Sequence, residues 1–134
     1  MVIDTSAIVA IALDEPDAAE FEARIADDPL RLISAATVLE TTIVIETRLG
    51  EAGGREFELW LLKIGAEIVP VDAEQADAAR RVWRSYGKGH HAAALNYGDC
   101  FSRALALVRG EPLLFRGEDF AKTDVNRPRE ASFR

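Results

Sequence analysis

The chain has 134 residues, of which 49% are hydrophobic and 29% are charged, a balance typical of one globular domain and not of a disordered chain. Its longest uncharged apolar run is far shorter than the roughly 20 residues of a membrane-spanning helix, and its first residues lack the basic segment of a signal peptide. We therefore expect a cytoplasmic protein without a membrane partner. The single cysteine, Cys100, excludes an internal disulfide and a multi-cysteine zinc site.

The net charge of −7 is unevenly distributed along the chain. The segment 78–98 contains no acidic residue, whereas Arg80, Arg81, Arg84 and Lys88 give it positive charge. An acidic protein with one basic segment can hold a phosphate chain locally. A solvent-exposed basic helix face explains the same pattern equally well.

Short apolar strands alternate with amphipathic helices in the first half of the chain. We predict a strand at 2–3, a helix over about 6–13, a helix that begins near Pro16, a strand at 31–34 and a helix that follows Ser34 and stops at Gly50. Serine is a favourable N-cap residue, and glycine commonly ends a helix.

The alternation continues in the second half. We predict a helix over about 57–64, a strand at 67–71, a helix over about 72–87, a helix over about 96–110 and a strand at 112–115. Strands that alternate with helices imply a parallel sheet with both faces covered. The predicted fold is therefore α/β: a three-layer α/β/α domain over 1–125 with a central, mainly parallel sheet of about four or five strands. The polar residues 126–134 would form a loosely ordered tail.

Four carboxylates are predicted at one edge of this sheet. Asp4 follows the first strand, and Glu40 lies in the helix that leaves the second strand. Asp99 is in the first turn of the helix that leads to the fourth strand, and Asp119 follows that strand. Because parallel sheets bind ligands at the carboxyl ends of their strands, we expect the four side chains to share one rim.

Each carboxylate also has a structural explanation. Asp4 and Asp99 could cap helices, and Asp119 could be an ordinary turn residue. Glu40 is harder to explain in this way, because its helical neighbours are mostly apolar and a lone buried carboxylate is costly. Glu46 is a rival on the same helix, but it lies nearly two turns farther from the rim.

Clustered carboxylates repel one another unless a cation joins them. Oxygen ligands without histidine or cysteine suit Mg²⁺ or Mn²⁺, and such an ion can bind phosphate oxygens and activate water. Ser6 could bond to a carboxylate or to a metal-bound water. We therefore interpret Asp4 as the first ligand of a metal site at a strand end.

The motifs around these residues resemble those of PIN-domain ribonucleases. They are VIDTSA at 2–7, LNYGDCFSRALA at 95–106 and PLLFRGEDFAKTD at 112–124, together with the mid-helix Glu40. Within that family the chain is similar to VapC-type toxins of bacterial toxin–antitoxin pairs. The resemblance extends from residue 1 to about 125 and implies a PIN-like fold.

The resemblance implies a Mg²⁺-dependent endoribonuclease, with Mn²⁺ as the alternative ion, that cleaves single-stranded or loop RNA, often tRNA. Asp4 and Asp99 would be the principal metal ligands. Asp119 would complete the site, directly or through water, with Asp124 as its rival. Glu40 would hold a metal-bound water or act in proton transfer.

The resemblance also implies supporting residues and partners. Ser6 and Asn96 would orient the acidic side chains. The family forms homodimers and is silenced by a cognate antitoxin whose C-terminal segment lies over the active-site groove. The residues that could guide RNA toward the site are Arg80, Arg84, Lys88, His90, His91, Arg103 and Arg116. Tyr97 could stack on a base or be buried.

Other functions fit the residues less well. A phosphatase of the haloacid-dehalogenase type needs a second aspartate where this chain has Ser6, and a receiver domain needs a lysine on a strand. Two alternatives stay open: a PIN-like module that binds RNA or protein without cleavage, and a housekeeping RNA-processing PIN nuclease.

Overall fold

The computed structural model describes residues 1–87, 89 and 95–117, so the predicted tail at 126–134 lies outside the described residues. In chain order the elements are β1 (Val2–Ile3), α1 (Thr5–Ala12), α2 (Ala18–Asp27), β2 (Leu32–Ser34), α3 (Ala35–Lys63), β3 (Glu67–Val69), α4 (Ala73–Tyr86), α5 (Tyr97–Arg109) and β4 (Leu113–Leu114). None of these described helices combines the length and the apolar character needed to cross a bilayer.

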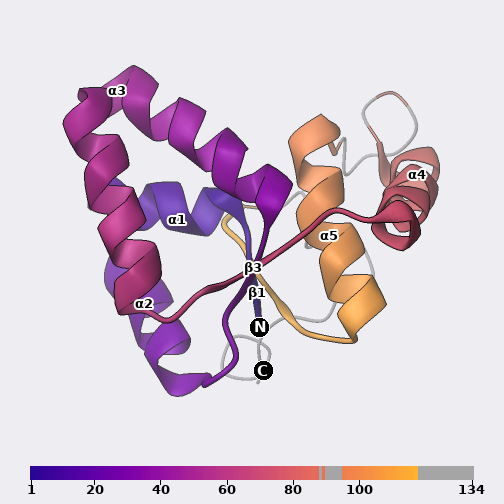
Figure 1. The fold of residues 1–134 in the computed structure, drawn as a ribbon, viewed down its shortest axis with the longest axis horizontal. Coiled ribbons are helices and arrows are strands. Elements are labelled where there is room, and N and C mark those ends of the chain that lie inside the picture. Colours follow the sequence, from indigo (N-terminus) through magenta and orange to yellow (C-terminus); the bar gives the residue numbers. More distant parts are fainter. Residues whose placement is uncertain (88, 90–94, 118–134) are drawn as a thin grey trace.

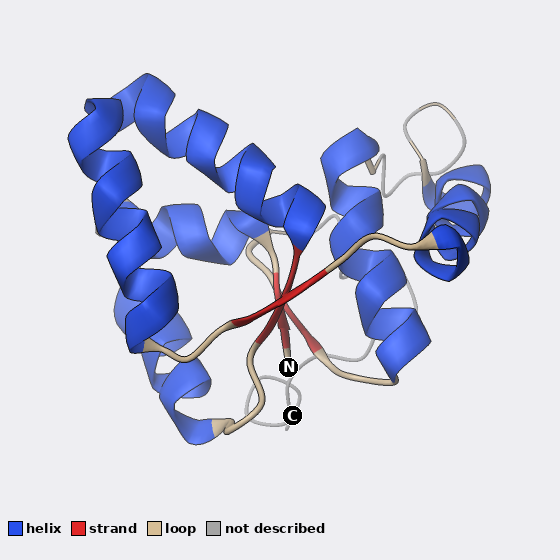
Figure 2. Cartoon of the chain, viewed as in Figure 1, coloured by secondary structure: helices blue, strands red, loops and turns tan. Residues whose placement is uncertain are grey.

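The strands form one parallel sheet in the order β3-β2-β1-β4. Helices α1, α2 and α3 cover one face of the sheet, and α4 and α5 cover the other (Figure 1, Figure 2). Side chains alternate between the two cores: Val2 and Leu113 are buried on the side of α4 and α5, and Ile3 and Leu114 on the side of α1, α2 and α3. The predicted three-layer α/β/α fold is confirmed, with four strands within the described residues.

The two helices predicted over 34–50 and 57–64 form one element, α3. Gly50 interrupts it with a backbone φ of 72° and ψ of −175°, which are not helical values. Glycine adopts a positive φ at little steric cost, so the chain turns there and at once resumes a helix (Figure 1). The predicted break is at the right residue, but it bends α3 instead of ending it.

Two further boundaries differ from the prediction for local reasons. α1 begins at Thr5 because Asp4 caps it. β3 ends at Val69 because Pro70 has no N–H group with which to continue the pairing.

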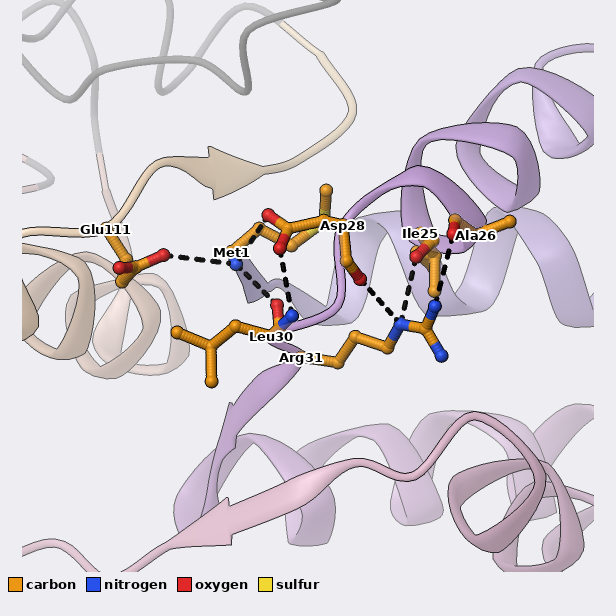
Figure 3. A network of polar contacts seen from close by, with 7 residues as sticks. All are labelled: Met1, Ile25, Ala26, Asp28, Leu30, Arg31 and Glu111. Carbon is orange, nitrogen blue, oxygen red and sulfur yellow. Dashed lines mark hydrogen bonds and ion pairs between the residues drawn. The ribbon is translucent and has the colours of Figure 1, made fainter.

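The amino end of the sheet is held by the N-terminal amine (Figure 3). The Met1 ammonium donates hydrogen bonds to Leu30 O at 2.6 Å, to Asp28 Oδ2 at 2.9 Å and to Glu111 Oε1 at 3.3 Å. Burial opposes ionisation of Asp28, but the hydrogen bond from the ammonium keeps the pKa of this carboxyl below its usual value. These contacts fix β1 between the segments that lead into β2 and β4.

Arg31 connects α2 to the end of α3 at the same edge. Its Nε donates to Ile25 O at 2.9 Å and Asp28 O at 2.8 Å, and its Nη1 donates to Ile64 O at 2.8 Å. Nη2 donates to Ala26 O at 3.3 Å (Figure 3). One guanidinium therefore satisfies several backbone carbonyls at helix ends, where they lack partners within the helix.

We predict that Arg31→Ala lowers the free energy of unfolding by about 2 kcal/mol, because it leaves these carbonyls without a charged donor. Urea denaturation followed by circular dichroism would measure the change. The matched control is Arg109→Ala, since Arg109 makes only a 3.6 Å ion pair with Glu67 on the surface. That variant should lose less than about 1 kcal/mol. Equal losses in the two variants would contradict this view of Arg31.

Candidate active site

Asp4 is buried at the point where β1 meets α1. It is the N-cap of α1, and its Oδ2 accepts a hydrogen bond from Ser6 N at 2.9 Å. The side chain is only 2% exposed, yet its Oδ1 has no hydrogen-bond partner within the part of the chain that the structure describes. The capping explanation is therefore correct for one oxygen and does not account for the other.

The surroundings of Asp4 oppose its negative charge. Burial raises the pKa of the Asp4 carboxyl, and the hydrogen bond from Ser6 N and the nearby Ser6 and Ser102 hydroxyls only partly offset this rise. A buried carboxylate that keeps a free oxygen is costly unless a proton or a cation neutralises it.

Glu40 lies on α3 next to this carboxylate. Its Oε1 accepts a hydrogen bond from Thr5 Oγ1 at 2.7 Å, and Thr5 Oγ1 lies 2.9 Å from Thr41 Oγ1. Burial raises the pKa of Glu40, the nearby negative charge of Asp4 raises it further, and the bond from Thr5 opposes both. The structure therefore brings Asp4 and Glu40 together at one edge of the sheet.

Asp99 is held by the start of α5. Its Oδ2 accepts a hydrogen bond from Asn96 N at 2.9 Å, and Asn96 Oδ1 accepts one from Asp99 N at 3.0 Å, which completes a capping box. Burial and the neighbouring Asp99 charge raise the pKa of the Cys100 thiol to about 11. Cys100 is therefore a protonated, buried thiol.

The first turn of α5 lies directly against Glu40. A Cβ atom at Gly98 would overlap Glu40 Oε2, so the carboxylate can occupy this place only because residue 98 is a glycine. One turn farther along α5, Ser102 Oγ lies 3.2 Å from Thr37 Oγ1 of α3, and both side chains are buried. The starts of α1, α3 and α5 meet at this edge (Figure 1).

The described residues include three of the four predicted acidic side chains. Asp4 and Glu40 are neighbours, Asp99 is on the adjoining turn of α5, and Asp119 and its rival Asp124 lie outside the described residues. Among residues 1–87, 89 and 95–117, no three His, Cys, Asp or Glu side chains are grouped so as to hold a metal ion.

Ser6 joins the site to the end of the sheet. Its Oγ accepts a hydrogen bond from Arg116 N at 2.8 Å, so the chain that leaves β4 passes beside Asp4. Glu46 is exposed and lies against Gly54, on the other side of the bend in α3. Its position does not support it as a rival of Glu40.

Sequence reasoning missed the hydroxyl groups that surround the carboxylates. The missed residues are Thr5, Thr41 and Ser102. A signal was available, because Thr37 and Thr41 are one helical turn apart on a face that the apolar pattern predicts to be buried. Polar residues on a core face need partners, and here the hydroxyls are partners of one another and of the carboxylates.

The basic residues fall into four groups. Arg80 and Arg84 are exposed on α4, whereas Lys88, His90 and His91 lie outside the described residues. Arg103 is 1% exposed, with its guanidinium carbon 4.5 Å from the centre of the Tyr86 ring, so it cannot guide RNA as we expected. Arg116 pairs with Glu15 at 3.2 Å and with Asp17 at 3.0 Å, which offsets its charge.

Comparison with known proteins identifies relatives over nearly the whole chain. The PIN-domain family model matches residues 1–126. Ribonuclease VapC of Mycolicibacterium smegmatis is 64% identical over 125 residues, which cover 93% of this chain and 97% of that protein. Ribonuclease VapC30 of Mycobacterium tuberculosis H37Rv is 60% identical over 125 residues, covering 93% and 95%.

Solved structures have the same fold. VapC20 of Mycobacterium tuberculosis, a toxin that cleaves the sarcin–ricin loop, matches with a TM-score of 0.76 at 16% identity, covering 92% of this chain and 95% of that one. A chain of VapBC2 from Rickettsia felis, bound to a DNA fragment from its promoter, matches with a TM-score of 0.72 at 13% identity, covering 94% of each. At such low identity these two structures show only that the fold is shared. Membership of the family is shown by the family model and by the relatives with 60% and 64% identity. The chain belongs to the PIN-domain family and, within it, to the VapC ribonucleases.

Proposed function

We propose that this chain is a metal-dependent endoribonuclease that acts as the toxin of a toxin–antitoxin pair. Relatives named as VapC ribonucleases, with 60% and 64% identity, support this activity. The structural observation that carries the proposal is Asp4, because its Oδ1 is buried and has no partner among the described residues. A helix cap alone does not require such an oxygen, whereas a cation-binding site does.

The same oxygen supports Mg²⁺, with Mn²⁺ as the alternative ion. Asp4 and Asp99 would hold the metal, and Asp119 or Asp124, outside the described residues, would complete the set. Carboxylate oxygens are the ligands that these hard ions prefer. When bound, the ion would offset charge on the phosphate and lower the pKa of water.

We assign proton transfer to Glu40. Its Oε1 is occupied by the hydrogen bond from Thr5, so Oε2, which lies against Gly98, is the atom that would take a proton from the attacking water. The pKa of Glu40 is raised, first by burial and then by the Asp4 charge, so this group takes up a proton more readily than an ordinary glutamate, as a proton-transfer residue must.

Ser6 and Asn96 would keep the acidic side chains in position. Ser6 N holds Asp4 Oδ2, while its Oγ is held by Arg116 N. Asn96 fixes Asp99 through both bonds of the capping box. Side chains that are locked in this way need little rearrangement during the reaction.

The proposed substrate is tRNA or another structured RNA with an exposed loop. Arg80 and Arg84 are exposed on α4, and with Lys88 they would attract the RNA backbone. We also propose a cytoplasmic location, a cognate antitoxin and a homodimer. Leu39 and Ile43, one turn apart and exposed on α3, offer a protein partner an apolar surface beside Glu40.

We predict that Asp4→Asn slows RNA cleavage at least about 100-fold, since even residues that only support metal ligands contribute 10- to 100-fold. Glu40→Gln should slow it about 10²- to 10⁴-fold, as expected for lost proton transfer. The assay is cleavage of total bacterial RNA by purified protein with Mg²⁺, Mn²⁺ or EDTA. EDTA should abolish cleavage by the parent.

Glu46→Gln is the matched control for Glu40, because it makes the same change on an exposed part of α3. It should cleave at the parental rate. Parental cleavage by Asp4→Asn would refute the site assignment. A folded parent that cuts no RNA with either metal would favour the alternative of a binding module without cleavage.

A second prediction concerns pH and stability without metal. Burial raises the pKa of Asp4 above 3.8, so the folded chain binds more protons than the unfolded chain just above that pH, and its stability falls as pH rises through the window. Asp4→Asn keeps a good N-cap and removes the charge. In EDTA at pH 7 it should therefore unfold at a higher urea concentration than the parent.

The difference should shrink as the pH is lowered toward 4. Asp28→Asn is a control with the opposite expected sign. The lowered pKa of Asp28 stabilises the fold at pH 7, so this variant should unfold at a lower urea concentration than the parent. Mg²⁺ should stabilise the parent and leave Asp4→Asn unchanged. If Asp4→Asn were less stable than the parent in EDTA, capping would outweigh the cost of the buried charge.

A further inference from the structure

A groove of about 420 Å³ lies between α4 and α5, outside the group of Asp4 and Glu40. Trp83 of α4 and Tyr97 and Phe101 of α5 supply three aromatic side chains to its lining, and Arg80 and Arg84 add positive charge. Its volume falls within the range of about 300–1,000 Å³ that small-molecule sites occupy. Neither the acidic site nor the hydrophobic cores require this combination of side chains.

Two of the three aromatic rings of the groove, Tyr97 and Trp83, are exposed, and Phe101 is half-buried. Tyr97 is 80% exposed, and its ring meets that of Phe101 edge to face, with 4.9 Å between centroids. Trp83 is 42% exposed, and its indole packs over Gly87, where a Cβ atom would overlap the ring. Aromatic surface is therefore open to solvent in the groove, and each exposed ring has a neighbour on one side.

The charge of the groove favours an anionic ligand. Arg80 pairs with Asp77 at 3.2 Å, and Arg81 pairs with the same carboxylate, so part of this charge is offset. Arg84 is exposed and has no ion pair among the described residues. A guanidinium beside aromatic faces matches the phosphate and the flat base of a nucleotide.

The groove is also close to the proposed cleavage site. Tyr97 and Asp99 belong to the same turn of α5, and Gly98 between them contacts Glu40. The helix that separates the two places is about 10 Å across, and a stacked strand advances about 3.4 Å per nucleotide. A strand bound in the groove would therefore reach the acidic site within a few nucleotides.

We propose that this groove binds one unpaired base of the RNA substrate, stacked on Tyr97 and Trp83, with a neighbouring phosphate on Arg84. The inference rests on the proposed ribonuclease function and adds to it a subsite that selects single-stranded RNA. Bases in a duplex are already stacked on each other and cannot enter. The combination of exposed rings, an unpaired arginine among the described residues and the nearby Asp99 favours RNA over a peptide as the occupant.

The test is binding, measured in EDTA so that cleavage does not interfere. The probe is a fluorescein-labelled single-stranded RNA of about 12 nucleotides, and the same sequence as a duplex is the comparison. Tyr97→Ala should weaken single-strand binding about 5- to 150-fold, the effect of losing one stacked base. Tyr97→Phe should restore it, because phenylalanine keeps the ring.

Salt dependence separates stacking from charge. Arg84→Ala should reduce the slope of log affinity against log salt by about 0.7, the contribution of one phosphate contact on a single strand. Tyr97→Ala should leave that slope unchanged. The matched controls on the far part of α5 are Leu107→Ala and Arg109→Ala, both on exposed residues. They should bind as the parent does.

Several results would overturn the inference. They are a parent that does not bind the single strand, a Tyr97→Ala variant that binds like Leu107→Ala, and a loss that is equal for single strand and duplex. A Tyr97→Ala variant that binds RNA normally but no longer binds its antitoxin would reassign the groove to that protein. If the groove variants behave as expected while the parent never cleaves RNA, the subsite stands and the nuclease proposal fails.

Discussion

The placement of a buried carboxylate between β1 and α1 is the constraint on which the rest of the site depends. Asp4 cannot move, because its Oδ2 caps α1 and the strand before it is fully buried. Its Oδ1 is buried and has no hydrogen-bond partner among the described residues, and this burial disfavours the charged form of the carboxyl. The Ser6 and Ser102 hydroxyls and the Glu40 carboxyl lie near Asp4, and a proton or a cation would stabilise this arrangement.

Capping and catalysis are compatible uses of the same side chains. Asp4 and Asp99 both occupy helix starts, and each has one oxygen fixed by a backbone N–H group. The capping bonds give Asp4 and Asp99 a structural role, and the same bonds hold their carboxylates in a fixed position. A carboxylate positioned by a helix start needs less reorganisation to bind a ligand than one on a free loop.

The two edges of the sheet have different tasks. At the amino edge, Met1 and Arg31 satisfy charges and carbonyls almost completely, and this edge stabilises the fold. At the carboxyl edge the polar groups are only partly satisfied. α5 connects two parts of that edge, since Gly98 meets Glu40 on one side and Phe101 lines the groove beside α4 on the other.

The sequence by itself determined the layers, the parallel sheet, the break at Gly50 and the caps at Asp4 and Asp99, because these follow from periodicity and from local backbone chemistry. The sequence also predicted an acidic site; the structure brings Asp4 and Glu40 together, while metal binding by Asp4 and Asp99 and the identity of the fourth carboxylate stay predictions. Only the tertiary structure decided that Arg103 is buried under Tyr86, that Thr5 bonds to Glu40 and that α3 continues beyond its bend. Burial and partner choice depend on packing between distant segments, which local patterns do not record.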